Sequence, residues 1–188
     1  IADDAQANLA LTTDRNHSHF AHRLEHAPHL EKMQWLDTDT ISADLADSWQ
    51  SPEIDGNTLA FLQYTSGSTG VPKGVMVSHG NLLHNSEYTA GLWQYDADSV
   101  MVTWLPIFHD IGLIFGILQP LYKGFPCYLM SPAAFVQHPF RWLHAISHYR
   151  ATHSGAPNFA YDLCVQKITT EQRATLDLSS WCMSLNAA

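Results

Sequence analysis

The stretch Tyr64-Thr-Ser-Gly-Ser-Thr-Gly-Val-Pro-Lys-Gly74 lies between two apolar runs with the composition of β-strands, Leu59–Tyr64 and Val75–Ser78. Its glycines leave room for backbone N–H groups to approach an anion, and consecutive N–H groups form a concave nest for phosphate oxygens. Its hydroxyl side chains add hydrogen-bond donors, and its lysine adds one positive charge. The stretch therefore predicts a polyphosphate-binding loop, with contacts from Thr65, Ser66, Gly67, Ser68, Thr69, Gly70, Lys73 and Gly74.

Two other kinds of segment share this composition. Flexible linkers are rich in Gly and Ser, but a linker is uncommon between two strands of a compact domain. In a P-loop nucleotide hydrolase, the pattern GxxxxGK[ST] follows a strand and opens a helix. Here Pro72 precedes Lys73, and Gly74 and a second strand follow it. The sequence therefore favours a phosphate loop of another type.

Outside the loop, β-rich runs alternate with helical patterns, which predicts an α/β fold with a parallel or mixed sheet flanked by helices. Further strands are expected at Leu9–Thr13, Met33–Leu36, Val100–Thr103, Cys127–Met130 and Trp181–Leu185. Helices are expected at Asn81–Tyr88, Ile111–Leu121, Pro139–Tyr149 and Asn158–Ile168. Residues 37–57 are acidic and polar and are broken by Pro and Gly, so they predict a connecting loop with at most a short helix.

The composition argues against several classes of protein. The 188 residues carry nine Lys and Arg against eighteen Asp and Glu, a formal charge of −9. This balance argues against a nucleic-acid partner, because nucleic-acid affinity comes mainly from neutralised phosphates. Cys127, Cys164 and Cys182 are widely spaced and specify neither a disulfide framework nor a thiolate metal site. The longest apolar run, Ile111–Leu118, falls well short of the roughly 20 residues that a membrane-spanning helix needs.

The first residues, Ile-Ala-Asp-Asp, show neither an initiator Met nor the basic and apolar pattern of a secretory signal. The sequence therefore predicts a cytoplasmic protein, and a chain cut from a longer one.

Several motifs carry a family resemblance. The loop and the VMVSHGNL segment after it resemble the phosphate loop, strand and helix of the adenylate-forming enzymes, which include acyl-CoA synthetases, luciferases, peptide-synthetase adenylation domains and fatty acyl-AMP ligases. The segment Trp104-Leu-Pro-Ile-Phe-His-Asp-Ile-Gly-Leu-Ile114 is similar to a second family signature that opens a helix and lines the active site. Its Asp110-Ile-Gly-Leu run, and Gly155-Ala-Pro-Asn-Phe-Ala-Tyr-Asp-Leu-Cys164, resemble the fatty acyl-AMP ligase branch. Ser184-Leu-Asn-Ala-Ala188 resembles the start of the adenine-binding turn.

This resemblance implies part of the large N-terminal AMP-binding domain of such an enzyme. Residues 1–57 would be a leading βα segment and acidic loop, residues 58–188 the phosphate-loop and acyl-pocket region, and the C-terminal domain would lie beyond the chain. The implied reaction is ATP-dependent activation of a fatty acid to an acyl-adenylate with release of pyrophosphate. Transfer of the acyl group to the thiol of an acyl carrier protein would follow, often to feed polyketide or lipopeptide assembly. ATP and Mg²⁺ are implied, with the metal ligands outside these residues, so the chain alone is expected to be inactive.

The resemblance also implies roles for single residues. Lys73 would be the catalytic residue, beside the phosphates of ATP. The active-site wall and acyl pocket would be formed by His109, Asp110, Gly112, Gly155, Asn158, Phe159 and Tyr161. The adenine turn would include Asn186, Ala187 and Ala188.

Alternatives stay open at this point. Within the family, a fatty acyl-CoA synthetase with coenzyme A as acceptor and a peptide-synthetase adenylation domain fit the same motifs. Outside it, an inert nucleotide-binding or scaffold module fits as well. Taken alone, His109 could be a structural histidine, and Phe159 and Leu163 could form the packing face of a helix. The acidic composition shows no basic patch that would steer either acceptor.

Twelve histidines raise the question of a metal. His17, His19, His22 and His26 lie close together, and His144 and His148 have the i, i+4 spacing that can ligate zinc. No HExxH pattern accompanies them, so no metal site is expected in these residues.

Overall fold

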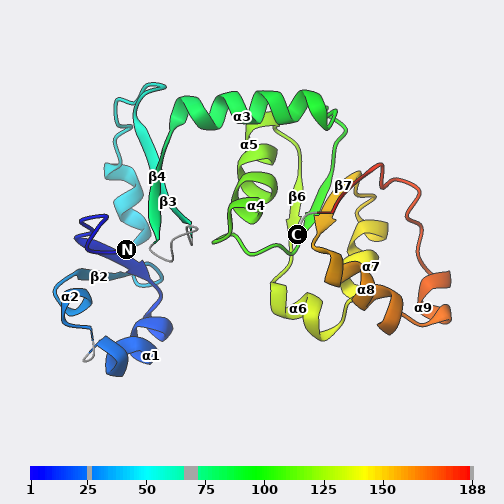
Figure 1. The fold of residues 1–188 in the computed structure, drawn as a ribbon, viewed down its shortest axis with the longest axis horizontal. Helices are drawn as coiled ribbons and strands as arrows, with labels where there is room; N and C mark the ends of the chain where they lie inside the picture. Colours follow the sequence, from blue (N-terminus) through cyan, green and yellow to red (C-terminus); the bar gives the residue numbers. More distant parts are fainter. Residues whose placement is uncertain (25–26, 66–71, 187–188) are drawn as a thin grey trace. The chain divides into compact units, whose positions relative to one another are not determined.

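The computed structural model describes residues 1–24, 27–65 and 72–186, and it forms two compact units, Ile1–Asn81 and Leu82–Ala188. The chain has an α/β fold, in which helices flank a parallel sheet (Figure 1). The boundary between the units falls inside helix α3 (His79–Leu92), because both strands beside the glycine-rich loop pair within the first unit.

The first unit contains two small sheets. Strands β1 (Leu9–Thr12) and β2 (Gln34–Asp37) pair in parallel and are connected through helices α1 (Asp14–Leu24) and α2 (Pro28–Glu31). Strands β3 (Leu59–Thr65) and β4 (Lys73–Ser78) form an antiparallel hairpin around the glycine-rich loop. The loop of residues 37–57 holds one short 3₁₀-helix, η1 (Ala43–Ser48), as predicted. Helices α1 and α2 were not predicted, because their histidine-rich sequences contain few apolar residues.

No side chain whose burial is described in residues 1–81 is fully buried. Large apolar residues are exposed in both sheets and in the connecting loop, among them Trp49 and Met76, each 71% accessible. A two-stranded sheet is marginally stable by itself, so this unit has little core of its own to hold it together.

The second unit is built on a four-stranded parallel sheet with the order β6-β5-β7-β8. Its strands are β5 (Met101–Thr103), β6 (Cys127–Leu129), β7 (His153–Ala156) and β8 (Met183–Asn186). A long helix of three segments, α4 (Asp110–Leu113), η2 (Ile114–Leu118) and α5 (Gln119–Lys123), connects β5 to β6. Helices α6 (Pro132–Gln137) and α7 (Phe140–His148) connect β6 to β7, and α8 (Asn158–Lys167) and α9 (Thr170–Ala174) connect β7 to β8.

The direction of these connections places the helices on the sheet. Crossovers between parallel strands are right-handed, so a connection that runs toward β6 and one that runs toward β8 cover opposite faces. The long helix therefore lies on one face, and α7 and α8 lie on the other (Figure 1).

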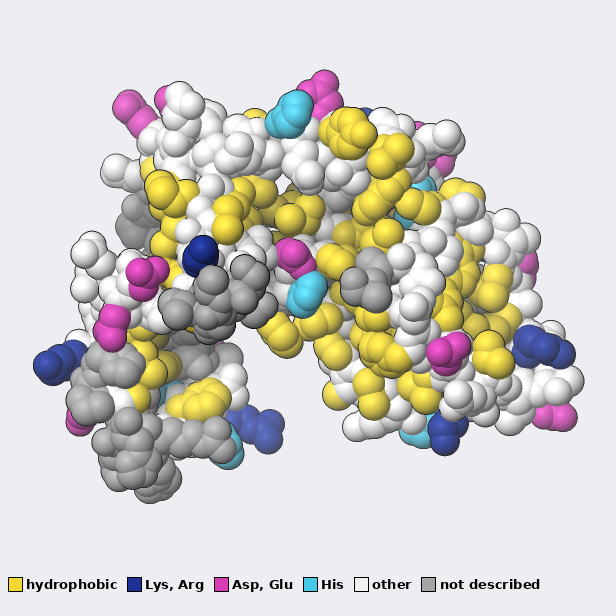
Figure 2. All heavy atoms as spheres, viewed as in Figure 1, with side chains coloured by type: hydrophobic (Ala, Val, Ile, Leu, Met, Phe, Trp, Pro, Cys, Tyr) yellow, Lys and Arg dark blue, Asp and Glu magenta, His cyan; other side chains and the backbone are white. Residues whose placement is uncertain are grey.

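Aromatic residues form the core of the second unit. Trp104 stacks on Phe135 with ring centroids 4.1 Å apart, and Trp142 meets both rings edge-on. All three side chains are buried, and burial of each large aromatic ring stabilises the fold by a few kcal/mol, on the order of 2 to 3. Figure 2 shows that hydrophobic side chains also gather on the outer face of this unit, where Lys and Arg are sparse.

The long helix widens to a π-helical turn at η2. Pro120 has no N–H to donate to the carbonyl of Gly116, four residues earlier, and the Cys127 thiol donates to that carbonyl instead, at 3.2 Å. Burial raises the pKa of the Cys127 thiol to about 11, which agrees with an inert structural cysteine. Within the described ranges, every helix is too short or too polar to span a bilayer.

Candidate functional site

The strand order creates a switch point between β5 and β7. The chain leaves β5 toward the face that carries the long helix, and it leaves the neighbouring β7 toward the face that carries α8. In open α/β sheets, ligands bind in the crevice at the carboxyl ends of strands where the connections diverge in this way. The segments that follow β5 and β7 are the two that carry the predicted active-site wall.

A cavity of about 360 Å³ opens at this point, and we call it the switch-point cavity. It is enclosed by residues at or after the carboxyl ends of the four parallel strands, together with the start of the long helix. Its lining is almost wholly apolar and consists of Trp104, Leu105, Pro106, His109, Ile111, Gly112, Pro132, Val136, Ala156, Pro157, Phe159 and Leu185. An apolar cavity with few polar groups suits a hydrocarbon ligand.

His109 and Asp110 begin the long helix. His109 is the N-cap, and its Nδ1 accepts a hydrogen bond from the Ile111 N–H at 3.3 Å. The Asp110 carboxylate accepts from the same N–H at 2.7 Å, in the first turn, where negative charge is favoured by the helix dipole. Both side chains are exposed, so the pair is accessible at the edge of the cavity.

The predicted wall residues fall into three groups. His109, Gly112 and Phe159 line the switch-point cavity. Asp110 lines a second cavity of about 340 Å³, which shares Ile111 and Leu185 with the first and extends along α3 past Trp93. Gly155, Asn158 and Tyr161 line neither cavity.

Phe159 is 53% exposed and meets Trp104 edge-on at 6.1 Å, so it is not a packed core residue. Tyr161 instead fixes the neighbouring strand, because its hydroxyl donates to the carbonyl of Leu185 at 2.7 Å and bonds the Ser184 hydroxyl at 2.9 Å. Asn158 is an exposed residue in the first turn of α8. Of these three, only Phe159 is placed to touch a ligand in the cavity.

Two glycines allow the close approach that shapes the cavity. A Cβ at Gly112 would collide with the carbonyl oxygen of Pro106, and a Cβ at Gly155 would lie 2.5 Å from the Cβ of Leu185. Both glycines are buried. Gly155 therefore acts on the site indirectly, by letting β7 and β8 pack tightly.

The phosphate-loop residues are partly described. Thr65 and Lys73 are paired in register at the loop end of the β3–β4 hairpin, and both are exposed. Cross-strand partners project from the same face of a hairpin, so a hydroxyl and an ammonium group stand together where the loop begins and ends. Ser66, Gly67, Ser68, Thr69 and Gly70 lie outside the described residues.

Packing also requires a glycine at position 74. A Cβ there would meet the ring of Tyr64 at 2.9 Å, and the Tyr64 hydroxyl donates to the Asp4 carboxylate at 2.6 Å. The absence of a side chain at Gly74 thus leaves the space that the Tyr64 ring occupies. Of the predicted adenine turn, Asn186 ends β8 and is exposed, and Ala187 and Ala188 lie outside the described residues.

No group of three or more metal-ligating side chains occurs among the residues whose placement is described. His17 bonds Asp37 at 2.9 Å and stacks on Trp35, which gives it a structural role. Burial raises the pKa of the Cys164 thiol to about 11, which argues against a thiol nucleophile there.

Sequence reasoning missed several wall residues. Pro132 and Val136 come from a segment with no recognised motif, and Leu185 lies in the Ser184–Ala188 motif but was not assigned to the wall. They reach the cavity only because the strands that hold or precede them end at the same edge of the sheet. The one available signal was position, since each lies at or shortly after the end of a strand.

Comparison with known proteins places these features in context. A family model described as AMP-binding enzyme matches residues 1–187. The medium-chain-fatty-acid–[acyl-carrier-protein] ligase JamA of Moorena producens is 50% identical over 189 residues, a region that covers 100% of this chain and 32% of that protein. The long-chain-fatty-acid–AMP ligase FadD28 of Mycobacterium tuberculosis is 33% identical over 186 residues, covering 96% of this chain and 32% of that protein.

A solved structure gives the same picture. The fatty acyl-adenylate ligase from L. pneumophila, in complex with acyl adenylate and pyrophosphate, superposes with a TM-score of 0.88 and 41% identity, covering 100% of this chain and 32% of that one. The chain thus spans about a third of the length of the relatives it matches.

Proposed function

The chain belongs to the AMP-binding enzyme family, and from that premise we propose that it is part of an enzyme that activates a fatty acid with ATP and passes the acyl group to an acyl carrier protein. The observation that carries the proposal is the apolar switch-point cavity beside the exposed His109–Asp110 pair. The names of the relatives, a fatty-acid–[acyl-carrier-protein] ligase and a fatty-acid–AMP ligase, support the same reaction.

In the first step, a carboxylate oxygen of the fatty acid attacks the α-phosphorus of ATP. A bond forms between that oxygen and phosphorus, and the bond to pyrophosphate breaks. Lys73, exposed opposite Thr65 at the base of the loop, would neutralise charge on the departing phosphates. Such positioned charge is a large term in phosphoryl and adenylyl transfer, since little covalent chemistry is required of the protein.

The switch-point cavity would hold the acyl chain. Phe159, Val136 and Leu185 would contact its methylene groups, and His109 would form the wall at the end where the carboxylate reacts. Each methylene moved from water into such a cavity contributes about 0.8 kcal/mol to binding. We give His109 a positioning role rather than proton transfer, because a carboxylate needs no base to attack phosphorus.

In the second step, the thiol of a phosphopantetheinylated carrier attacks the acyl carbonyl. A carbon–sulfur bond forms, AMP leaves, and the thiol proton passes to solvent. The proposal includes Mg²⁺ bound elsewhere in the enzyme, a cytoplasmic location, and products that feed polyketide or lipopeptide assembly.

The experiment compares full-length protein with its Lys73→Ala and Lys123→Ala variants. We expect fatty-acid-dependent pyrophosphate release to fall about 100-fold with Lys73→Ala, a loss typical of one charge-stabilising group. Lys123 is exposed at the end of α5 and lines no described cavity, so the same truncation there should leave the rate unchanged. A Lys73→Ala enzyme with normal kcat and normal KM for ATP would contradict the proposal.

A further inference from the structure

Charge is unevenly distributed along this acidic chain. Residues 1–81 carry four Lys and Arg against eleven Asp and Glu, a formal charge of −7, whereas residues 82–188 carry five against seven, a charge of −2. Within the second unit, the segment 132–174 carries four against two and is positive by two charges. These cations are far apart along the chain, so the sequence by itself shows no basic patch.

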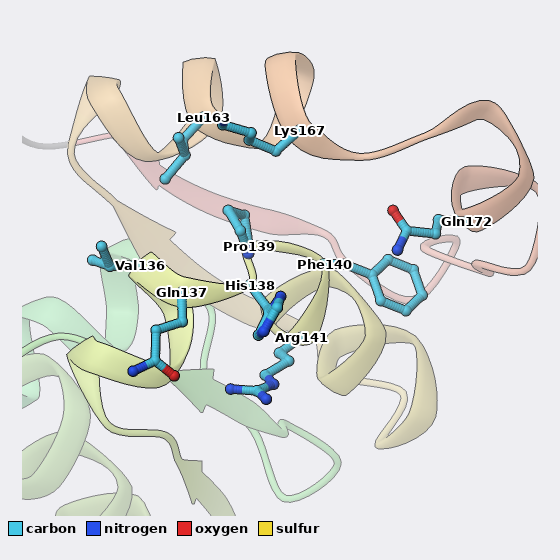
Figure 3. A pocket seen from close by; sticks show the side chains of 9 residues that line it. All are labelled: Val136, Gln137, His138, Pro139, Phe140, Arg141, Leu163, Lys167 and Gln172. Atoms are coloured by element: carbon cyan, nitrogen blue, oxygen red, sulfur yellow. The ribbon is translucent and has the colours of Figure 1, made fainter.

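The structure brings two of these cations to one groove. A cavity of about 580 Å³ lies between helix α8 and the turn that joins α6 to α7, and we call it the cationic groove. Leu163 and Lys167 come from α8 on one side, and Gln137, His138 and Arg141 come from the end of α6, the turn and the start of α7 on the other (Figure 3).

The positive charges of the groove are available to a ligand. No Asp or Glu lines it, and in the described part of the chain no carboxylate lies within the 4.0 Å ion-pair distance of Arg141 or Lys167. The Arg141 guanidinium makes one long hydrogen bond, of 3.4 Å, to the carbonyl of Ala134. In contrast, Arg150 nearby in the sequence is already paired with Asp177.

The groove adjoins the proposed acyl site. Val136 lines both the cationic groove and the switch-point cavity. Helix α8 likewise serves both, since Phe159 in its first turn lines the cavity and Lys167 at its end lines the groove. An anionic acceptor bound in the groove would therefore lie next to the switch-point cavity, which holds the acyl group that the acceptor is to receive.

We propose that the cationic groove is a docking site for the acidic carrier protein that accepts the acyl group. This inference rests on the proposed function. A carrier protein presents surface carboxylates and the phosphodiester that tethers its thiol arm, so its charge is opposite to that of the groove. Arg141, His138 and Lys167 are all exposed, as in the polar rim of a protein interface, whereas a small-molecule site encloses its ligand. Complementary charge at such a rim speeds encounter and makes it sensitive to salt.

The test uses full-length protein with the double variant Arg141→Glu/Lys167→Glu, and Lys123→Glu as the control with a charge reversal elsewhere in the same unit. Fatty-acid-dependent pyrophosphate release should be unchanged in all three proteins. For transfer to phosphopantetheinylated carrier protein, kcat/KM should fall at least about tenfold in the double variant, mainly through KM, as expected for lost electrostatic steering. It should stay within twofold of wild type in the control.

Two further measurements sharpen the result. Wild-type transfer should slow as ionic strength rises, and the double variant should lose most of this dependence. The single variant Lys167→Glu, on the exposed side of α8, should give a smaller loss of kcat/KM for the carrier. It tests the same proposal if the double variant does not fold.

Other outcomes count against the inference. Unchanged kcat/KM for the carrier in a folded double variant would overturn it. An equal loss with coenzyme A as acceptor would assign the groove to a phosphate that both acceptors share, and would overturn docking of the carrier surface. A wild-type protein that releases no pyrophosphate with any fatty acid would instead contradict the proposed function.

Discussion

At the scale of single residues, polar groups hold the centre of the second unit in place. Ser154 is fully buried on β7, where its hydroxyl donates to the carbonyl of Val102 at 2.6 Å and accepts from the Trp142 indole at 2.8 Å. Its neighbour His153 is also buried and bonds Thr152 and the carbonyl of Trp93. Because the side chains of both His153 and Ser154 have partners, β7 tolerates a sequence that lacks the apolar character of a buried strand.

His153 predicts a pH dependence of stability. Burial lowers the pKa of His153, although the bond to Trp93 and the nearby Asp96 carboxylate act in the opposite direction. In the unfolded chain a histidine titrates near pH 6.5, so below that pH the unfolded state binds a proton that the folded state resists. The contribution of His153 to the free energy of unfolding should therefore be fully present above about pH 6.5, and the free energy of unfolding should decrease as the pH falls below that value. Urea unfolding of wild type and His153→Gln at several pH values measures this, and an identical pH slope in both proteins would contradict the assignment.

At the scale of elements, the long helix depends on a glycine at its start. The helix packs so closely on the end of β5 that Gly112 has no space for a side chain beside Pro106. The neighbouring helix α3 contains Gly91, where an added Cβ would meet no other atom within 4 Å. Gly112 thus has no room for a side chain, whereas Gly91 does.

These two glycines form a matched pair for mutagenesis. Gly112→Ala should destabilise the protein by about 3 kcal/mol or more, the range expected when a methyl group is forced into a packed site. Gly91→Ala should be neutral or stabilising by up to about 1 kcal/mol, because alanine is the better helix former. Thermal unfolding followed by circular dichroism separates the two. A Gly112→Ala protein as stable as Gly91→Ala would show that the helix can shift away from Pro106 at little cost.

At the scale of the whole molecule, the two units differ in how they are held together. The buried core lies in the second unit, whereas the first consists of small sheets whose described side chains are partly or fully exposed. Local opening costs least where few apolar contacts are lost.

The first unit should therefore be the site of early proteolysis. Brief elastase treatment of the 188-residue chain should cut first within residues 1–81, above all in the exposed loop of residues 37–57, and leave a fragment from the second unit. Mass spectrometry of the timed digest identifies the cuts. Initial cleavage between α7 and β8 would contradict this order of stability.

The sequence alone predicted the α/β class and the strands other than β7, because these depend on local patterns of glycine, apolar and β-branched residues. It also predicted that His109 precedes a helix, since Pro106 and Asp110 are signals of a helix start. The role of Lys73 at the phosphates stays a prediction.

Tertiary structure decided the rest. It separated His109, Gly112 and Phe159, which line the switch-point cavity, from Gly155 and Tyr161, which pack strands, because lining depends on where neighbouring strands end and not on a residue's own motif. Strand β7 could not be predicted, since the partners that satisfy His153 and Ser154 come from distant segments. The cationic groove likewise exists only in three dimensions: Arg141 and Lys167 are ordinary surface residues in the sequence, and the packing of α8 beside the start of α7 brings both to the lining of one groove in an acidic chain.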